Sequence, residues 1–284
     1  SLLSRLDSLV SGRGPLARRY QAFRDRLLIP AGRVDTVFRT AIAACRVRTL
    51  AHLSLPPGER FDLEYVKGTS WNAYNWYKGG YRSLIQVNLD FPIPVDRAVD
   101  LACHEGYPGH HVYNARLEES LVKGRGWLEF SVYPLFSAQS LIAEGSANYG
   151  IEMAFPSAER TAFERDVLFP LAGLDTALAG RNAAVRDVVE RLNYARNEVA
   201  RRFLDGQIDS AGARTAMQRY WLITPDAAAK TLRFITTYRS YVINYNLGRD
   251  LVADWVARQG DSEDARWLAF GELLSSPRLP HDLK

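Results

Sequence analysis

The octapeptide HEGYPGHH, residues 104 to 111, constrains this chain more than any other stretch. It begins like the helical H-E-x-x-H pattern, in which two histidines four residues apart bind one zinc ion. Pro108 stands where the second histidine would fall, and the next two histidines are His110 and His111. On an unbroken helix His104 and His110 would point about 120° apart, so they can share a metal ion only if the helix bends.

The Pro-Gly pair can provide that bend. Pro108 lacks the N–H that would bond the carbonyl of His104, and its ring clashes with that carbonyl. Gly109 can adopt backbone conformations closed to other residues. The bend favours His110 as the second ligand, whereas His111 would lie about 10 Å from His104 along a straight helix. The choice between His110 and His111 stays open, and a helix end carrying solvated histidines is the alternative to a metal site.

A third protein ligand is expected, because catalytic zinc sites commonly use two histidines, one glutamate and water. Glu144 is the candidate, since it lies in the apolar stretch SLIAEGSANYGIEM and a buried carboxylate needs a partner or a metal. Gly145 leaves room there for another element to approach. Glu105 follows the first histidine, where a general base would stand. Asp100, one turn before His104, could orient its ring.

Three segments together resemble a known family. HEGYPGH, AEGSANY and YVINYNLG are similar to the motifs H-E-x-x-P-G-H, E-G-W-A-x-Y and Y-x-x-G of a bacterial family of unknown function, over residues 60–255. Its members are regarded as gluzincin-like zinc metallopeptidases. The resemblance implies one Zn²⁺ bound by His104, His110 and Glu144, with Glu105 as the catalytic base. Ser146 stands where the family usually has tryptophan, Tyr113 stands where it often has glutamine, and the chain is much shorter than typical members. These differences affect the substrate pocket more than the metal site.

A tyrosine-rich segment, TTYRSYVINYNLGRD, offers further site residues. Tyr238, Tyr241 and Tyr245 follow the spacing of one helix face. The resemblance favours Tyr245 as a second catalytic residue, a donor to the developing oxyanion. Tyr241, Arg239 and Arg249 are candidates for substrate binding. Core packing of the tyrosines and surface ion pairs of the arginines are the alternatives.

The hydrophobic pattern predicts a mainly α, α+β protein with a single domain, residues 1–284. Residues 1–56 and 94–284 have helical periodicity, and the second range contains the metal site. Residues 60–91 are aromatic and β-branched, which predicts a small antiparallel sheet. The strand SLIQVNLDF could be an edge that pairs with an extended peptide. WNAYNWY could line a pocket, but a packed hairpin is the preferred interpretation.

Composition sets limits on partners and location. The net charge of +4 comes from scattered residues, which argues against a nucleic-acid groove. No apolar run is long enough to span a membrane. Cys45 and Cys103 are expected to be buried free thiols. The chain starts at Ser1, so an N-terminal segment is expected to be missing, and a cytoplasmic location is slightly favoured. Oligomeric state stays open.

These observations favour a zinc-dependent metallopeptidase that acts on short peptides or other small amides. One alternative is a metal-dependent hydrolase of a non-peptide amide or ester. Another is a helical metal-binding protein without catalytic activity. A carboxylate-bridged iron site would need a second set of carboxylates, ideally a Glu-x-x-His pair, and the sequence contains none.

Overall fold

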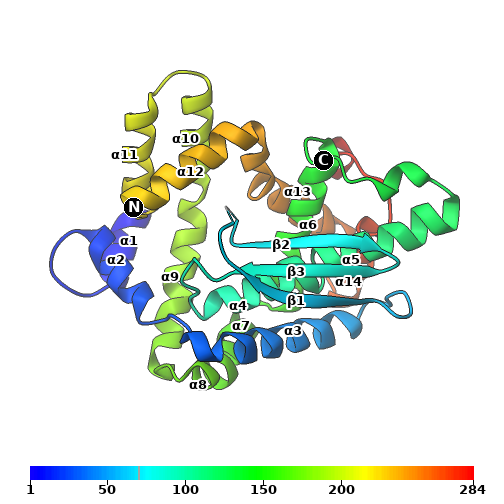
Figure 1. The fold of residues 1–284 in the computed structure, drawn as a ribbon, viewed down its shortest axis with the longest axis horizontal. Helices are drawn as coiled ribbons and strands as arrows, with labels where there is room; N and C mark the ends of the chain where they lie inside the picture. Colours follow the sequence, from blue (N-terminus) through cyan, green and yellow to red (C-terminus); the bar gives the residue numbers. More distant parts are fainter. Residues whose placement is uncertain (70) are drawn as a thin grey trace.

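The computed structural model describes residues 1–69 and 71–284 and is mainly helical, with one three-stranded sheet (Figure 1). This confirms the predicted fold class. Three helices precede the sheet: α1 (Leu2–Leu9), α2 (Leu16–Asp25) and α3 (Val34–Leu50). Helix α3 runs beneath the sheet in the view of Figure 1 and contributes Val37, Phe38 and Ala41 to the core. The helical region expected at the N-terminus is therefore present, with breaks.

The sheet contains β1 (Arg60–Val66), β2 (Ala73–Gly79) and β3 (Arg82–Asn88), in the order β1-β3-β2. Strands β2 and β3 form an antiparallel hairpin, whereas β1 pairs with β3 in parallel. The sheet is thus mixed, and the expected antiparallel arrangement holds only for the hairpin. The glycines at the tight turn, Gly79 and Gly80, both have positive φ, which suits a hairpin turn. Strand β3 therefore lies between β1 and β2.

Strand β3 is therefore central, and the prediction that it forms the sheet edge is wrong. Its residues Ser83, Ile85 and Val87 alternate toward the helices and are buried. Strand β2 forms one edge of the sheet instead. Figure 1 shows β2 at the side of the sheet nearer to α6 and α13.

The remaining chain is helical, with several short 3-10 or π segments (η). Among the helices, α12 has a regular start: the side chain of Thr224 accepts from the N–H of Ala227, and Pro225 occupies the first helical position. The elements are α4 (Asp96–Leu101), η2 (Ala102–Gly106), α5 (His110–Leu117), η3 (Glu118–Lys123), η4 (Leu128–Ser131), α6 (Ala138–Ala154), α7 (Ser157–Phe163), η5 (Glu164–Leu168), α8 (Phe169–Ala172), η6 (Thr176–Leu178), α9 (Ala179–Leu192), α10 (Tyr194–Leu204), α11 (Ser210–Tyr220), α12 (Pro225–Tyr238), η7 (Arg239–Asn244), α13 (Leu247–Gln259), α14 (Glu263–Leu273) and η8 (Pro280–Leu283).

Two apolar clusters hold these elements together. The larger one joins α1–α9, α13, α14 and the sheet, with Phe38, Phe155 and Phe270 among its fully buried side chains. A smaller one, which includes Met217 and Ile235, lies among α10, α11 and α12. Figure 1 shows α10 and α11 as a helical pair that stands away from the sheet.

The two cysteines form a disulfide that joins α3 to the π-helical segment η2. Both cysteines are fully buried, as expected, but the prediction that they are free thiols is wrong. The pairing could not be predicted from local sequence patterns, because 58 residues separate Cys45 from Cys103. The bond fixes the residue that directly precedes His104.

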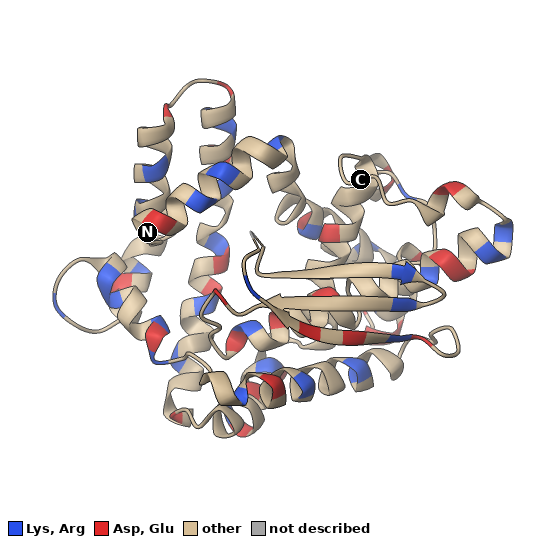
Figure 2. Cartoon of the chain, viewed as in Figure 1, with Lys and Arg blue, Asp and Glu red and all other residues tan. Residues whose placement is uncertain are grey.

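Charged residues of both signs are interspersed along the helices in Figure 2. On the strand faces seen there, acidic residues gather on β1. Within the described ranges, the structure has no helix with the length and apolarity needed to cross a membrane.

Replacing both Cys45 and Cys103 by alanine should lower the free energy of unfolding by about 2 to 4 kcal/mol, because the disulfide closes a long loop in the unfolded chain. Urea unfolding with and without reductant measures the difference. Reductant should destabilise the wild type and leave the double alanine variant unchanged. A wild type that is equally stable under both conditions would contradict the bond.

Candidate metal centre

The helix that carries His104 ends in a bend at Pro108 and Gly109. Helix α4 continues into the π-helical η2, whose last hydrogen bond runs from the N–H of Tyr107 to the carbonyl of Ala102 (3.3 Å). The N–H of Gly109 then donates to the carbonyl of Cys103 (2.9 Å). A Cβ atom on Gly109 would lie 1.8 Å from the carbonyl oxygen of His104, so no other residue fits there. Helix α5 begins at the next residue, His110.

This bend brings the side chains of His104 and His110 together. Their ring centroids are 4.7 Å apart, and the rings are nearly perpendicular. The Nε2 atoms of His104 and His110 lie 3.3 and 3.6 Å from the carboxylate oxygens of Glu144. One donor atom from each of the three residues lies within 4.8 Å of the other two. The structure therefore brings together the three ligands that the sequence suggested.

His111 points away from this centre, although it is the neighbour of His110. Its Nδ1 lies 2.8 Å from the hydroxyl of Ser83 and its Nε2 2.9 Å from the carboxylate of Glu59. The hydroxyl of Tyr107 also donates to Glu59 (2.7 Å). The side chain of His111 is fully buried. Glu59 thus holds residues on both sides of the Pro-Gly bend, a role that no sequence pattern indicated.

Glu144 reaches the centre because α6 packs closely against α13. A Cβ atom on Gly145 would lie 2.4 Å from the backbone of Gly248, and one on Gly248 would lie 2.6 Å from the carbonyl of Leu141. The two helices can meet at this distance only through glycines. The space that Gly145 was expected to leave is filled by the start of α13.

The carboxylate of Glu144 is buried and has one unused acceptor. Its Oε1 accepts a hydrogen bond from the hydroxyl of Tyr241 (2.7 Å), whereas Oε2 makes no hydrogen bond, although Nε2 of His104 lies 3.3 Å from it. Burial raises the pKa of Glu144, but the charge of His110 and the close contacts with the rings of His104 and His110 outweigh it and hold that pKa far below its usual range. Burial lowers the pKa of His110, but the negative charge of Glu144 outweighs this effect, and the pKa of His110 is raised overall. The surroundings therefore stabilise the charged carboxylate of Glu144 next to a positive charge.

Asn148, one turn after Glu144, orients the first histidine. Its side-chain oxygen lies 3.1 Å from Nδ1 of His104, and its amide nitrogen donates to the carbonyl of Tyr245 (3.2 Å). An N–H at Nδ1 would leave the Nε2 lone pair of His104 free for a metal. The residue expected to do this, Asp100, instead pairs with Arg97 and Arg160 (3.0 and 2.7 Å).

Glu105 lies beside the centre with a free carboxylate. The residue is buried, and the side-chain amide of Asn75 on β2 donates to its backbone carbonyl (2.7 Å). Among the described residues, none makes a hydrogen bond to the Glu105 carboxylate. Its charge nevertheless contributes to raising the pKa of both His110 and Tyr245. Such an unpaired carboxylate can accept a proton.

The tyrosines surround the centre, although the helix expected to carry them is broken. Helix α12 ends at Tyr238, and Arg239 has a φ of +50° before η7 begins. The rings of Tyr238 and Tyr241 are 6.0 Å apart, and those of Tyr241 and Tyr245 are 5.9 Å apart. Burial and then the nearby Glu144 raise the pKa of both Tyr241 and Tyr245 well above the usual value. Both phenols therefore stay protonated and can donate hydrogen bonds.

Two further tyrosines, Tyr74 on β2 and Tyr133, were missed as site residues. Burial raises the pKa of both tyrosines, and smaller contributions come from Tyr238, Glu105 and Glu144 for Tyr74 and from Glu144 for Tyr133. Residues 73–77 of WNAYNWY belong to β2 of the hairpin, as preferred, and Asn75 within them contacts the backbone of Glu105. The alternation of aromatic and polar residues in this segment was the available signal, but it is equally typical of packed strands.

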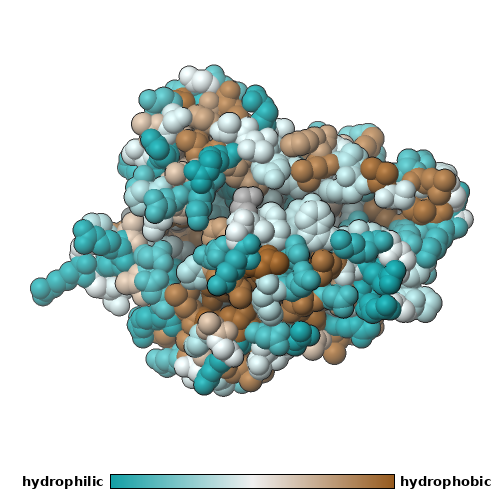
Figure 3. Space-filling model, viewed as in Figure 1, coloured by the Kyte–Doolittle hydropathy of each residue, from teal (hydrophilic) through white to brown (hydrophobic). Residues whose placement is uncertain are grey.

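Apolar side chains are exposed next to these tyrosines. Phe136 is 70% exposed, and its ring lies 6.3 Å from that of Tyr238. Leu128 and Val132, earlier in the same segment, are also largely exposed. Figure 3 shows apolar surface at the right-hand end of the molecule, over the segment that follows α5 in Figure 1. This apolar surface adjoins the tyrosines of the centre.

The two candidate arginines differ in their surroundings. The guanidinium of Arg249 lies 2.6 Å from the carboxylate of Glu152 and 2.9 Å from that of Asp250. Arg239 is exposed, directly after Tyr238, and has no side-chain hydrogen bond in the part of the chain that the structure describes. Of the two, Arg239 has the guanidinium that is available to a ligand.

Comparison with known proteins identifies a similar fold and no function. No family model matches the chain, and no curated protein matches it. It is similar to the crystal structure of "the putative lipoprotein from Colwellia psychrerythraea", with a TM-score of 0.73 and 16% sequence identity. The match covers 99% of this chain and 48% of that one, so this chain spans about half the length of that protein. At this identity the likeness concerns the fold alone.

Replacing Gly145 by alanine should lower the free energy of unfolding by about 3 kcal/mol or more, because its methyl group would overlap the backbone of Gly248. Urea unfolding followed by circular dichroism measures the change. Gly180→Ala in α9 is the matched control, since open space surrounds that position. It should be neutral or stabilise by up to about 1 kcal/mol. Equal effects at the two positions would refute the close helix contact.

Proposed function

We propose that this protein is a zinc-dependent hydrolase that cleaves amide bonds of peptides. The observation that carries the proposal is the convergence of His104, His110 and Glu144 on one point, next to the unpaired carboxylate of Glu105. A set of two histidines and one glutamate is a common ligand set of catalytic zinc. The resemblance of the three sequence motifs to a family of zinc metallopeptidases points to the same chemistry.

The donor chemistry fits such an ion. Glu144 Oε2 is buried and makes no hydrogen bond, and it faces Nε2 of His104 at 3.3 Å, so both atoms are available to a cation between them. Asn148 favours the tautomer of His104 that exposes Nε2 to the same point. When bound, zinc supplies Lewis acidity that polarises a carbonyl group and acidifies water.

The remaining chemistry belongs to the side chains of the centre. Glu105 would accept the proton of the attacking water and return it to the leaving amine, which is the work of a general base and acid. Asn75 fixes the backbone of Glu105 and so the place of that carboxylate. Tyr245, whose phenol remains protonated, would donate a hydrogen bond to the oxyanion that develops on the substrate carbonyl. The hydroxyl of Tyr241 already donates to Glu144, so this tyrosine would hold the ligand in place.

A peptide substrate is favoured by the position of strand β2. This strand forms an edge of the sheet, and its Asn75 contacts the residue that would act as the base. An extended peptide that paired with this edge would place its backbone carbonyls near Glu105. The aromatic side chains of Tyr74 and Phe136 would then contact the substrate side chains. Arg239 could bind a substrate carboxylate.

The matched substitutions Glu105→Gln and Glu144→Gln should separate catalysis from metal binding. Glu105→Gln should retain zinc and lose about 100-fold or more in kcat, because the general base is removed. Glu144→Gln should lose zinc, because an amide oxygen carries no charge to bind the ion. Elemental analysis and hydrolysis of a fluorogenic peptide library, with and without chelator, measure the two effects.

Each alternative gives a different result in these assays. A structural metal site would leave Glu105→Gln indistinguishable from wild type. A hydrolase of other amides or esters would cleave small-molecule substrates and leave the peptide library intact. Purified wild type that takes up no zinc would refute the proposal.

Asn148→Ala should weaken zinc affinity about 10- to 100-fold, because the ring of His104 loses its hydrogen-bond acceptor. Competition with a chromogenic chelator measures this affinity. Asn148→Asp keeps an acceptor and should retain most of it, whereas the exposed Asn193→Ala is a neutral control. Full affinity in Asn148→Ala would exclude the positioning role.

A further inference from the structure

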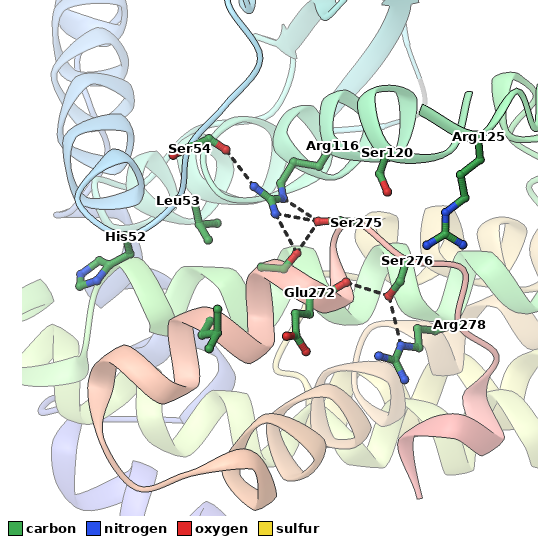
Figure 4. A pocket seen from close by; sticks show the side chains of 12 residues that line it. His52, Leu53, Ser54, Arg116, Ser120, Arg125, Glu272, Ser275, Ser276 and Arg278 are labelled. Carbon is green, nitrogen blue, oxygen red and sulfur yellow. Dashed lines mark hydrogen bonds between the residues drawn. The ribbon is translucent and has the colours of Figure 1, made fainter. Parts of the chain in front are cut away.

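A cavity lies away from the metal centre, and its lining contains none of the residues that the proposed hydrolase uses. It has a volume of about 540 Å³ and lies between the segment after α3, the α5–η3 region and α14 with its following turn (Figure 4). This volume falls within the range of small-molecule sites, about 300 to 1,000 Å³. Its lining contains the guanidinium groups of Arg116, Arg125 and Arg278.

The three arginines have only neutral partners in the described part of the chain. Arg116 donates to the carbonyls of Ser54 (2.8 Å) and Gly271 (3.1 Å) and to the hydroxyl of Ser275 (2.7 Å). Burial lowers the pKa of Arg116, and Glu119 opposes this only in part. The positive charge of this guanidinium is therefore only partly balanced by its surroundings.

Arg125 and Arg278 are held by aromatic rings. The guanidinium of Arg125 lies 5.0 Å from the ring centre of Trp127, and that of Arg278 lies 5.1 Å from the ring centre of Trp255. Stacking on a ring leaves the N–H groups at the edge of a guanidinium free to donate. Figure 4 shows Arg125 directed from one wall toward Ser276 and Arg278 on the other.

The net positive charge of the cavity lining favours a ligand with two negative charges. Among the described residues that line it, Glu272 has the one carboxylate, so the three arginines leave an excess of two positive charges when His52 is uncharged. A phosphate monoester carries between one and a half and two negative charges at neutral pH, roughly, with three strong acceptor oxygens. A single carboxylate would balance only half of the excess. Ser120 adds a hydroxyl to the lining.

We propose that this cavity binds a small organic molecule through its phosphate group. The guanidiniums of Arg125 and Arg278 hold the phosphate, because forked N–H donors match its oxygens. Arg116, whose N–H groups bind protein acceptors, adds positive charge beside them. The cavity is larger than a phosphate ion needs, and Leu53 and Leu268 give it apolar walls. These walls contact the organic part of the ligand.

Isothermal titration calorimetry on the full, chelator-treated chain tests this proposal, because removal of metal excludes phosphate binding at His104 and His110. The probes are phenyl phosphate, inorganic phosphate and acetate at equal ionic strength. Phenyl phosphate should bind saturably and more tightly than inorganic phosphate, and acetate should bind most weakly. Equal affinity for all three probes, or no saturable binding, would overturn the proposal.

Arg125→Ala and Arg278→Ala should each weaken phenyl phosphate binding about tenfold or more, because each removes a charge-assisted hydrogen bond. Arg214→Ala on α11 removes the same charge at an exposed site outside the cavity lining and should leave the affinity unchanged. Circular dichroism checks that the variants are folded. Binding that survives both substitutions at the cavity would show that the arginines do not form the site. Neither result depends on the peptidase proposal, since no metal is present.

Discussion

The buried carboxylate of Glu144 is the charge around which this structure is arranged. A carboxylate enclosed by protein is costly unless positive charge or hydrogen bonds balance it. Here two imidazoles and the hydroxyl of Tyr241 face it, and one of its oxygens still accepts no hydrogen bond. Such an arrangement is stable with protonated histidines or with a cation between the three groups. The second state requires neutral histidines, and the hydrogen bond from His104 to Asn148 suits it.

Several distant contacts fix the geometry of these three residues. The Cys45–Cys103 disulfide and the His111–Glu59 pair hold the two sides of the bend at Pro108 and Gly109. The contact between Gly145 and Gly248 sets how close α6 comes to α13. Each of these contacts is made by a direct sequence neighbour of a candidate ligand, namely Cys103, His111 or Gly145. Rigid support of this kind is what a site needs to hold ligands in position when the ion is absent.

The local sequence was informative where chemistry and backbone geometry depend on neighbouring residues. The octapeptide predicted a break at Pro108 and Gly109, and the apolar surroundings of Glu144 predicted its burial. Helical periodicity and the β-branched segment were enough for the fold class. Sequence did not predict the parallel pairing of β1 with β3, because strand order depends on the path of the chain between strands. It also placed Tyr238, Tyr241 and Tyr245 on one continuous helix, which the backbone at Arg239 interrupts.

Sequence by itself determined which residue types could form the centre, because the spacing of His104, Pro108 and His110 limits the backbone to a few shapes. Tertiary structure alone decided which partners surround them. Asn148 replaced the expected Asp100 as the partner of His104, since Arg97 and Arg160 engage that aspartate. Cys45 met Cys103, and β2 took the edge position instead of β3. All of these depend on the packing of segments far apart in the chain, which no local pattern of side chains encodes.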